Sequence, residues 1–310
     1  MGPPPSRPLK PEPLQPGDTI GVVAPASCFD AEAFQRGVQK LEGLGFNVRY
    51  REDIFSKQRY LAGSDPRRFG ELKEFLLAPD VKAIFAARGG YGSMRLLPQL
   101  EKLSPPQPKI LMGYSDITSL LNFAWQRWGW VTFHGPVVAK DIGDRLAECG
   151  ERSLLQALTD PKPLGEFKQE GLVGLQPGQA RGRLVGGCLS LVVCSLGTPY
   201  QIETEGCVLY LEDIGEKLYS LDRMLTHLRQ AGILHKAKAI VFGPLKDAHD
   251  EPVVVMNLLI DLLGDLKIPI LFGFPSGHRE DCWTIPLGIE VSVDADRSAL
   301  TFEEGALAGG

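Results

Sequence analysis

The stretch 108–130, PKILMGYSDITSLLNFAWQRWGW, joins a short apolar run directly to a helical pattern. The run 109–112 is typical of a buried strand, and the apolar residues that follow recur at spacings of three and four, as on one face of a helix: Ile117, Leu120, Leu121 and Ala124. Only the turn 113–116 separates the two patterns. We therefore expect the hydroxyl of Ser115 beside unpaired amides and the positive end of a helix dipole, where ligands bind in open α/β sheets.

Ser115 is open to two interpretations. Ser and Asp are favoured first residues of helices, so the pair 115–116 could be no more than a helix cap. Alternatively, Ser115 is a nucleophile on a tight strand-to-helix turn, with the amide of the next residue as half of an oxyanion hole. The signature G-x-S-x-G is not met, because Ile117 occupies the second glycine position. The residues of this turn leave both interpretations open.

Composition narrows the class of protein. With 310 residues and 44% hydrophobic content, the chain can bury a large core and most simply forms two domains. Its net charge of -5 gives no support to nucleic acid or an anionic membrane as a partner, while small neutral or anionic ligands remain open. The six cysteines are scattered without a C-x-x-C pair, which is typical of reduced thiols in a cytoplasmic protein. We find neither a membrane helix nor a signal peptide in the sequence.

Changes of pattern along the chain suggest its domains. Residues 1–16 carry seven prolines and are expected to form an extended or disordered arm. Strands and helices alternate with short links over 17–160, which predicts a doubly wound, mostly parallel α/β sheet. Residues 161–181 are rich in Pro, Gly and Gln without periodicity, so we place a linker there. Residues 182–310 then form a second, smaller α/β domain.

A glycine-rich turn follows the predicted strand 81–87, with the sequence RGGYGS at 88–93. Glycines allow several amides to point into one small space, which suits an anion or a developing negative charge. The spacing matches neither a dinucleotide fingerprint nor a Walker loop, and a simple tight turn would also explain it. Because the carboxyl ends of parallel strands share one edge of a sheet, this turn and the turn carrying Ser115 are expected to be neighbours.

The second half supplies a candidate acid. The predicted strand 207–211 ends at Glu212, and a carboxylate at the mouth of a buried strand is costly unless it is paired or solvated. The alternative is a polar loop that caps the next predicted helix, 217–230.

Two histidines are candidates for a base. His278 follows the predicted strand 268–272 and a Pro-Ser-Gly turn, so its imidazole could reach a cleft. His134 follows the strand 130–133 but is equally well explained as a hydrogen-bonded structural residue. With Ser115 and Glu212, His278 completes the chain order serine, acid, histidine found in other α/β serine hydrolases.

Longer motifs extend this comparison. They occur in one order between residues 17 and 288: GDTIGVVAPAS, ARGGYGSMRLLP, GYSDITSLLN, FHGPV, GRLVGGCLSLV, LYLEDIGEKLYSLDRMLTHLRQAG and GFPSGH. Through these motifs and their order along the chain, the sequence resembles the LD-carboxypeptidase family of serine peptidases. This family includes muropeptide LD-carboxypeptidases and microcin-immunity peptidases. The departures are peripheral, namely the proline-rich arm and a short C-terminal tail.

The resemblance implies a catalytic triad and a reaction. It assigns the triad to Ser115, Glu212 and His278, and the oxyanion hole to the amides of Gly90 and Asp116. It implies a Rossmann- or flavodoxin-like N-terminal domain that carries the serine and a smaller C-terminal domain that carries the acid and base, often in a homodimer. The implied reaction is hydrolysis before a C-terminal D-amino acid, typically release of D-alanine from a cytosolic murein tetrapeptide during peptidoglycan recycling.

Other substrate contacts are less specific. A carboxypeptidase needs a cation or amides for the terminal carboxylate, and Arg88 with Gly89 is a local candidate, although Arg88 could instead pair with a surface acid. Tyr91 and Trp283 flank the site and could line it, with packing as the alternative role. We expect no metal and no cofactor, since the sequence has neither a His/Cys cluster nor H-E-x-x-H.

Two alternative functions remain. An immunity-type peptidase that cleaves a peptidyl-nucleotide would use the same triad, and the sequence does not separate the two substrates. A nucleotide or sugar-phosphate binding protein would use the glycine turns, with Ser115 as a helix cap.

Overall fold

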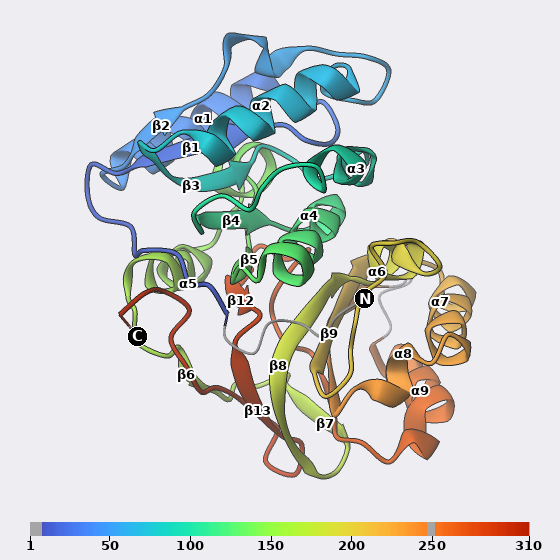
Figure 1. Cartoon of the computed structure of the whole chain (residues 1–310). Coiled ribbons are helices and arrows are strands. Elements are labelled where there is room, and N and C mark those ends of the chain that lie inside the picture. The colour runs from blue at the N-terminus through green and yellow to red at the C-terminus, as the bar shows by residue number, and fades with distance from the viewer. Residues whose placement is uncertain (1–7, 247–251, 310) are drawn as a thin grey trace.

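The computed structural model describes residues 8–246 and 252–309, which form two sheets stacked one above the other along the molecule (Figure 1). The upper sheet has six strands in the order β12-β5-β4-β3-β1-β2, and the lower sheet has eight in the order β6-β14-β13-β8-β9-β10-β11-β7. The predicted fold class, a doubly wound α/β domain followed by a second α/β domain, is confirmed.

The first sheet is built from short apolar strands. They are β1 (Thr19–Val23), β2 (Asn47–Arg49), β3 (Val81–Ala86), β4 (Ile110–Gly113), β5 (Thr132–His134) and β12 (Ile285–Leu287). All neighbouring pairs among β1 to β5 are parallel, and only β12 runs antiparallel, along β5. The central strands are buried along almost their whole length, as expected for a parallel sheet covered on both faces.

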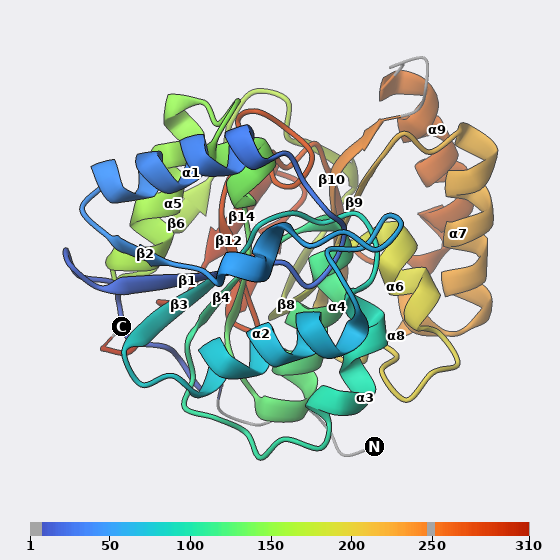
Figure 2. The same cartoon turned by 90° about the horizontal axis from the view of Figure 1, so that it is seen from above.

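Helices cover both faces of this sheet (Figure 2). Helix α1 (Ala31–Gly43) lies on one face, while α2 (Asp65–Leu77) and the short α3 (Leu97–Leu100) lie on the other. The side chain of Asp30 caps α1 by accepting from the amide of Ala33 at 2.8 Å, and Ser64 caps α2 in the same way. The remaining helical segments of this half are η1 (Glu52–Phe55), η2 (Ser93–Leu96), η5 (Val138–Ile142) and α5 (Glu148–Thr159).

The helix predicted after Ser115 is divided into three parts. A 3-10 turn, η3 (Ser115–Ile117), leads into α4 (Thr118–Phe123), and a π-helical turn, η4 (Ala124–Trp128), follows. Gly129 ends the last turn with a left-handed backbone. The periodicity of the sequence therefore predicts the extent of the helical segment but not its change of pitch.

The second sheet mixes parallel and antiparallel pairing. Its strands are β6 (Gly165–Phe167), β7 (Val173–Gln176), β8 (Gln179–Cys188), β9 (Val208–Ile214), β10 (Ala239–Lys246), β11 (Ile270–Phe272), β13 (Glu290–Asp294) and β14 (Ala299–Phe302). Strands β8 to β11 are mutually parallel. One face carries α6 (Leu189–Ser195), α7 (Leu218–Gln230), α8 (Ile233–Lys236) and α9 (Pro252–Leu263), with η6 (Gly264–Leu266) after α9.

Several predicted boundaries differ from the structure. Strand β9 was expected to end before Glu212, but it continues to Ile214 because β10 pairs with it over that length. The stretch 161–181, predicted to be a linker, carries β6, β7 and the beginning of β8, which all pair within the second sheet. Such pairing joins residues that are far apart in the sequence, so local composition does not reveal it.

The described part of the proline-rich arm packs onto the first domain. Leu14 is buried, and its amide donates to the carbonyl of Leu158 at 2.8 Å. The amide of Leu9 donates to the carbonyl of Gly129 at 2.7 Å. Residues 8–15 of the arm therefore form no helix and lie against the domain before a turn at 16–17, while residues 1–7 lie outside the described residues.

The two sheets share buried contacts. One apolar cluster fills both faces of the first sheet and continues onto one face of the second, and another lies between the second sheet and its helices. Helix α4 docks on the end of β8, where Asn122 donates to the carbonyl of Gly186 at 3.1 Å and Thr118 accepts from the amide of Cys188 at 3.0 Å. This packing holds the loops of the two domains in a fixed relation.

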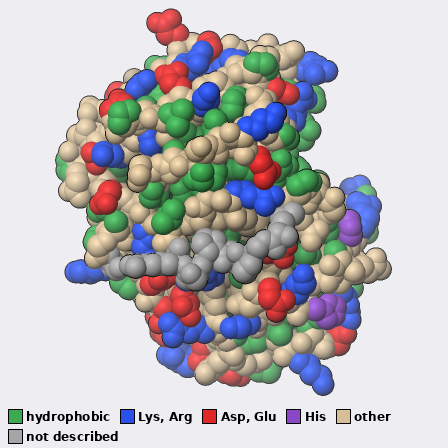
Figure 3. Space-filling model, in the orientation of Figure 1, with side chains coloured by type: hydrophobic (Ala, Val, Ile, Leu, Met, Phe, Trp, Pro, Cys, Tyr) green, Lys and Arg blue, Asp and Glu red, His purple; other side chains and the backbone are tan. Residues whose placement is uncertain are grey.

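The surface carries both signs of charge. On the face drawn in Figure 3, Lys and Arg side chains are interspersed with Asp and Glu. Among the helices of the described residues, none is both long and apolar enough to cross a membrane.

Candidate active site

Ser115 has a strained backbone at the end of β4. Its φ is 59°, in the left-handed region, which costs a residue with a side chain about 1–2 kcal/mol. A helix cap has an extended backbone instead, and Ser115 caps neither η3 nor α4. The cap interpretation is therefore wrong, and the geometry is that of the strained elbow that exposes a nucleophile. Ser115 is accordingly only partly buried.

The glycine-rich turn lies directly against this serine. A Cβ added to Gly89 would come within 3.2 Å of the Ser115 hydroxyl oxygen. Gly90 has a φ of 98°, and a Cβ there would collide with the side chain of Ser27. Only glycine fits at position 90, and a larger residue at position 89 would press against Ser115. The expected proximity of the two turns at one sheet edge is confirmed.

Buried polar groups connect the two turns. The carboxylate of Asp116 accepts from the amide of Ser93 at 2.8 Å, and the Ser93 hydroxyl donates to the carbonyl of Asp116 at 2.6 Å. The buried Arg68 donates to the carbonyl of Gly92 at 2.8 Å. Burial raises the pKa of Asp116, while the hydrogen bonds from Ser93 oppose this rise. These contacts fix the backbone of the glycine turn relative to the amide that follows Ser115.

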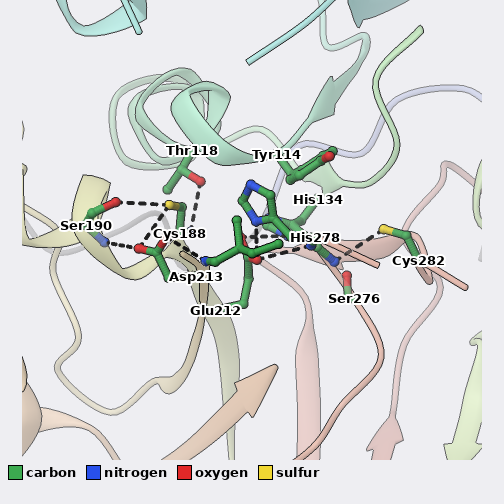
Figure 4. Close-up of polar contacts among 12 residues, drawn as sticks. Tyr114, Thr118, His134, Cys188, Ser190, Glu212, Asp213, Ser276, His278 and Cys282 are labelled. Carbon is green, nitrogen blue, oxygen red and sulfur yellow. Dashed lines mark hydrogen bonds and ion pairs between the residues drawn. The ribbon is translucent and has the colours of Figure 1, made fainter. Parts of the chain in front are cut away.

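The acid and base predicted for the second half meet in the structure. His278 Nδ1 lies 2.8 Å from Glu212 Oε2, and the backbone amide of His278 donates to the same oxygen at 3.3 Å (Figure 4). Glu212 is fully buried on β9, and His278 follows β11 in a loop. Gly277, with a φ of 94°, allows this approach, because a Cβ there would collide with the carboxylate.

This pairing affects the pKa of Glu212 and the tautomer of the His278 imidazole. Burial raises the pKa of Glu212, whereas the hydrogen bonds and charge of His278 lower it. A carboxylate that accepts from Nδ1 fixes the imidazole tautomer and leaves Nε2 free to take a proton. The pair is therefore arranged as an oriented general base.

Tyr114 brings the serine and the histidine together. Its ring packs edge-on against the His278 ring, with 4.7 Å between the centroids. Its hydroxyl donates to Asp141 at 3.2 Å, which holds the ring in place. Because Tyr114 directly precedes Ser115, the backbone that carries the serine lies beside the imidazole from the other domain.

His134 lies behind the acid and does not reach the surface. Its Nε2 is 3.8 Å from Glu212 Oε1, and within the described residues neither ring nitrogen has a hydrogen-bond partner. Burial, together with the charge of His278, lowers the pKa of His134 to about 3, so the ring is neutral. His134 therefore fits neither of the two predicted roles, because it does not face solvent as a base would and its ring has no hydrogen bond within the described residues.

The remaining predicted contact residues occupy different environments. Arg88 is exposed and donates to the carbonyl of Cys28 at 2.7 Å, not to a surface acid. Tyr91 is exposed beside Gly90 and contacts the ring of Tyr60, with centroids 5.8 Å apart. Trp283 packs against Phe167 at 4.9 Å, which agrees with the packing role.

Sequence reasoning missed several supporting residues. Ser27 accepts from the amide of Tyr91 at 3.1 Å and so supports the glycine turn. Its position just after β1, at the carboxyl edge shared by all the parallel strands, was an available signal. Tyr114 gave no such signal, because its role depends on a loop more than 150 residues away in the chain.

A strained serine lies on a strand-to-helix turn, and the ring of the residue before it contacts a histidine that is paired with a buried acid of the second domain. This arrangement is typical of an α/β serine hydrolase. The sequence places the chain within this class. Residues 20–135 match the LD-carboxypeptidase N-terminal domain and residues 181–293 match the LD-carboxypeptidase C-terminal domain. The chain belongs to the LD-carboxypeptidase family and is a serine carboxypeptidase, as the resemblance implied.

Two kinds of relative, carboxypeptidases named for murein peptides and a self-immunity protein, are similar to this protein over almost its whole chain. The "Probable murein peptide carboxypeptidase" of Bacillus subtilis is 35% identical, covering 97% of this chain and 96% of its own. The structure of muramoyltetrapeptide carboxypeptidase from Oxalobacter formigenes has a TM-score of 0.79 at 28% identity, covering 93% of this chain and 99% of its own. The microcin C7 self-immunity protein of Escherichia coli is 28% identical over 96% of this chain and 97% of its own. Its complex with aspartyl sulfamoyl adenosine has a TM-score of 0.88 at 26% identity, covering 97% of this chain and 100% of its own.

Proposed function

We propose that this enzyme is an LD-carboxypeptidase that releases D-alanine from murein tetrapeptides in the cytoplasm, as a step of peptidoglycan recycling. The observation that carries the proposal is the buried Glu212–His278 pair, which lies against the residue preceding the strained Ser115. Relatives named for murein peptides support the substrate class. We further propose that the active form is a homodimer that needs no cofactor.

In the proposed acylation step, Ser115 Oγ attacks the carbonyl carbon before the terminal D-amino acid. His278 Nε2 takes the hydroxyl proton, and Glu212 stabilises the imidazolium. The amides of Gly90 and Asp116 hold the oxyanion of the tetrahedral intermediate, each contributing about 3 kcal/mol. Collapse of the intermediate breaks the C–N bond, and His278 donates its proton to the departing amine.

The second half of the cycle removes the acyl group. D-Alanine leaves with the proton received from His278, and a water molecule takes its place. His278 takes a proton from this water as it attacks the ester of Ser115, and returns the proton to the serine when the C–O bond breaks. The products are the shortened peptide with a free carboxylate and the unchanged enzyme.

The direct test is amino acid release from two peptides. We expect D-alanine from a murein tetrapeptide that ends in D-alanine and almost no release from the isomer that ends in L-alanine. Ser115→Ala should lose nearly all turnover while unfolding at a similar temperature, because the residue is only partly buried. Wild-type turnover in Ser115→Ala would reject the assignment of the nucleophile.

A second candidate substrate is a peptidyl-nucleotide. The similarity to the immunity protein in its complex with aspartyl sulfamoyl adenosine favours it. Both substrates would use the same triad, so competition decides between them. If an aminoacyl sulfamoyl nucleoside is hydrolysed with a higher kcat/KM than the tetrapeptide, the immunity function is the better assignment.

The third alternative, a nucleotide or sugar-phosphate binding protein, required Ser115 to be a helix cap. Ser115 caps neither η3 nor α4, so this requirement is not met. A fluorophosphonate probe tests this alternative directly. Labelling at Ser115 is expected of the hydrolase. No labelling, together with thermal stabilisation by a nucleotide, would favour a binding protein.

A further inference from the structure

Two cationic residues extend from adjacent backbone positions at the carboxyl edge of the first sheet. Arg88 opens the glycine-rich turn after β3, and Lys140 lies in η5, the segment after β5. The amide of Ala139 donates to the carbonyl of Ala87 at 2.9 Å, so Lys140 and Arg88 continue from backbone positions that are bonded to each other. Both side chains belong to exposed residues.

The nearby acid does not neutralise these two residues. Asp141 pairs with Arg145 at 3.1 Å and also accepts from Tyr114 and from the amide of Val137. Arg88 donates to a backbone carbonyl, which carries no net charge. Within 8–246 and 252–309, neither Arg88 nor Lys140 has an ion pair. Two positive charges at this edge are therefore left without a carboxylate.

Lys140 is also within electrostatic range of the catalytic groups. Partial burial lowers its pKa, the charges of Arg145 and Arg88 lower it further, and those of Asp141 and Glu212 oppose the fall. Like charges repel each other, and an anion bound by both residues would relieve the repulsion. Asp141 holds the ring of Tyr114, which contacts His278, so η5 is linked to the base through one residue.

The chemistry of the leaving group defines what such an anion would be. In the proposed reaction, His278 must reach the amine of the departing amino acid, and the carboxylate of that amino acid lies only two bonds beyond the amine. Cations that bind this carboxylate must therefore lie at the edge of the site close to the imidazole. Arg88 and Lys140 lie at the carboxyl edge of the first sheet, where Ser115 also lies, and neither has an acidic partner among the described residues.

We propose that Arg88 and Lys140 form the subsite for the terminal carboxylate of the departing D-amino acid. This proposal rests on the proposed LD-carboxypeptidase function. The planar guanidinium offers a two-pronged contact, and the ammonium adds a point charge from the other side. A peptide whose terminus is an amide would leave both cations unpaired, so the subsite also explains why such an enzyme would act only at free carboxyl ends.

The test compares two substrates that differ only at the terminus. A tetrapeptide with C-terminal D-alanine and the same peptide with D-alaninamide are offered to wild type, Lys140→Met and Arg88→Gln. Each variant should lose about 10- to 100-fold in kcat/KM on the free acid, the loss expected for one charged hydrogen bond. Turnover of the amide should change less than about twofold, so the preference for the acid collapses.

Control variants separate charge from general damage. Lys102→Met removes an exposed lysine in the link before β4, at the opposite end of the sheet, and should leave both rates unchanged. Lys140→Arg keeps the charge and should recover most of the acid preference. Fluorophosphonate labelling of Ser115 should proceed at the wild-type rate in Lys140→Met and Arg88→Gln, because the nucleophile and base are untouched.

The outcomes distinguish this proposal from the proposed function. An unchanged acid-to-amide ratio in both Lys140→Met and Arg88→Gln would overturn the subsite and leave the LD-carboxypeptidase intact. Equal cleavage of acid and amide by wild type would do the same. If wild type is labelled at Ser115 but releases nothing from either peptide, the LD-carboxypeptidase function fails, and the subsite fails with it.

Discussion

Replacing Glu212 by Gln tests the core of the proposed mechanism. The substitution keeps the volume of the side chain and removes the charge that faces His278 Nδ1 at 2.8 Å. During the reaction the imidazole becomes positive, and the carboxylate then stabilises it. Two unit charges about 4 Å apart at an effective dielectric constant of about 20 attract each other by roughly 4 kcal/mol. Loss of this attraction slows turnover by about 10³-fold.

The orientation of the new amide could add to the loss. If its NH2 group faces His278, Nδ1 must accept a hydrogen bond, and the proton moves to the nitrogen that should act as base. The equivalent change in a serine protease triad costs about 10⁴-fold in kcat. We therefore expect kcat for D-alanine release to fall by about 10³- to 10⁴-fold in Glu212→Gln. The melting temperature should not fall, since the variant no longer buries a charge.

The assay is steady-state release of D-alanine from the tetrapeptide, with thermal unfolding measured on the same samples. Glu205→Gln is the matched control, because Glu205 is exposed just before the other end of the same strand, β9. It should retain wild-type kcat. A folded Glu212→Gln that keeps more than about a tenth of wild-type kcat would refute the assigned role of this carboxylate.

Two further predictions concern the glycine turn and a buried acid. Gly89→Ala should abolish most turnover, because its Cβ would lie 3.2 Å from the Ser115 hydroxyl oxygen. Gly43→Ala is the control and should remain active, because no neighbouring atom lies within 4 Å of a Cβ at that position. Equal D-alanine release by the two variants would contradict this packing. Glu71 has its pKa raised from 4.5 to about 7 by burial, against the opposing effects of Arg67 and of the amide of Ala24. Between these values the folded state holds a proton that the unfolded state releases, so the contribution of Glu71 to stability is fully present below pH 4.5 and is lost as the pH rises through about 7. Relative to Glu71→Gln, wild type should lose up to roughly 3 kcal/mol of unfolding free energy between about pH 4.5 and about pH 8, measured by urea unfolding; a constant or rising difference would show that this carboxyl group is ionised throughout.

Much of the site can be located from the sequence because it lies at the ends of parallel strands. The stretch 108–130 predicts strand, turn and helix, and the glycines at 89 and 90 follow a neighbouring strand. Parallel pairing then requires both turns to share one edge, which the contact between Gly89 and Ser115 confirms. Strand-end positions and chain order make Glu212 and His278 candidate partners of Ser115, and the resemblance of the longer motifs then assigns them to the triad. Local patterns do not show that the two side chains are paired.

Tertiary structure decided what local patterns left open. Whether Ser115 caps a helix or stands on a strained elbow depends on its φ of 59°, and neighbouring turns must hold such a conformation in place. The end of β9, and hence the position of Glu212 inside a strand, depends on pairing with β10. The contact of Tyr114 with His278 needs both domains to be docked.

The sequence by itself therefore determined the alternation of strands and helices, the glycine turn and the candidate serine, because these depend on spacing along the chain and on the conformations that each residue permits. Only the tertiary structure decided which polar groups lie within hydrogen-bond distance. That distance depends on the packing of two sheets whose contacting residues are far apart in the sequence.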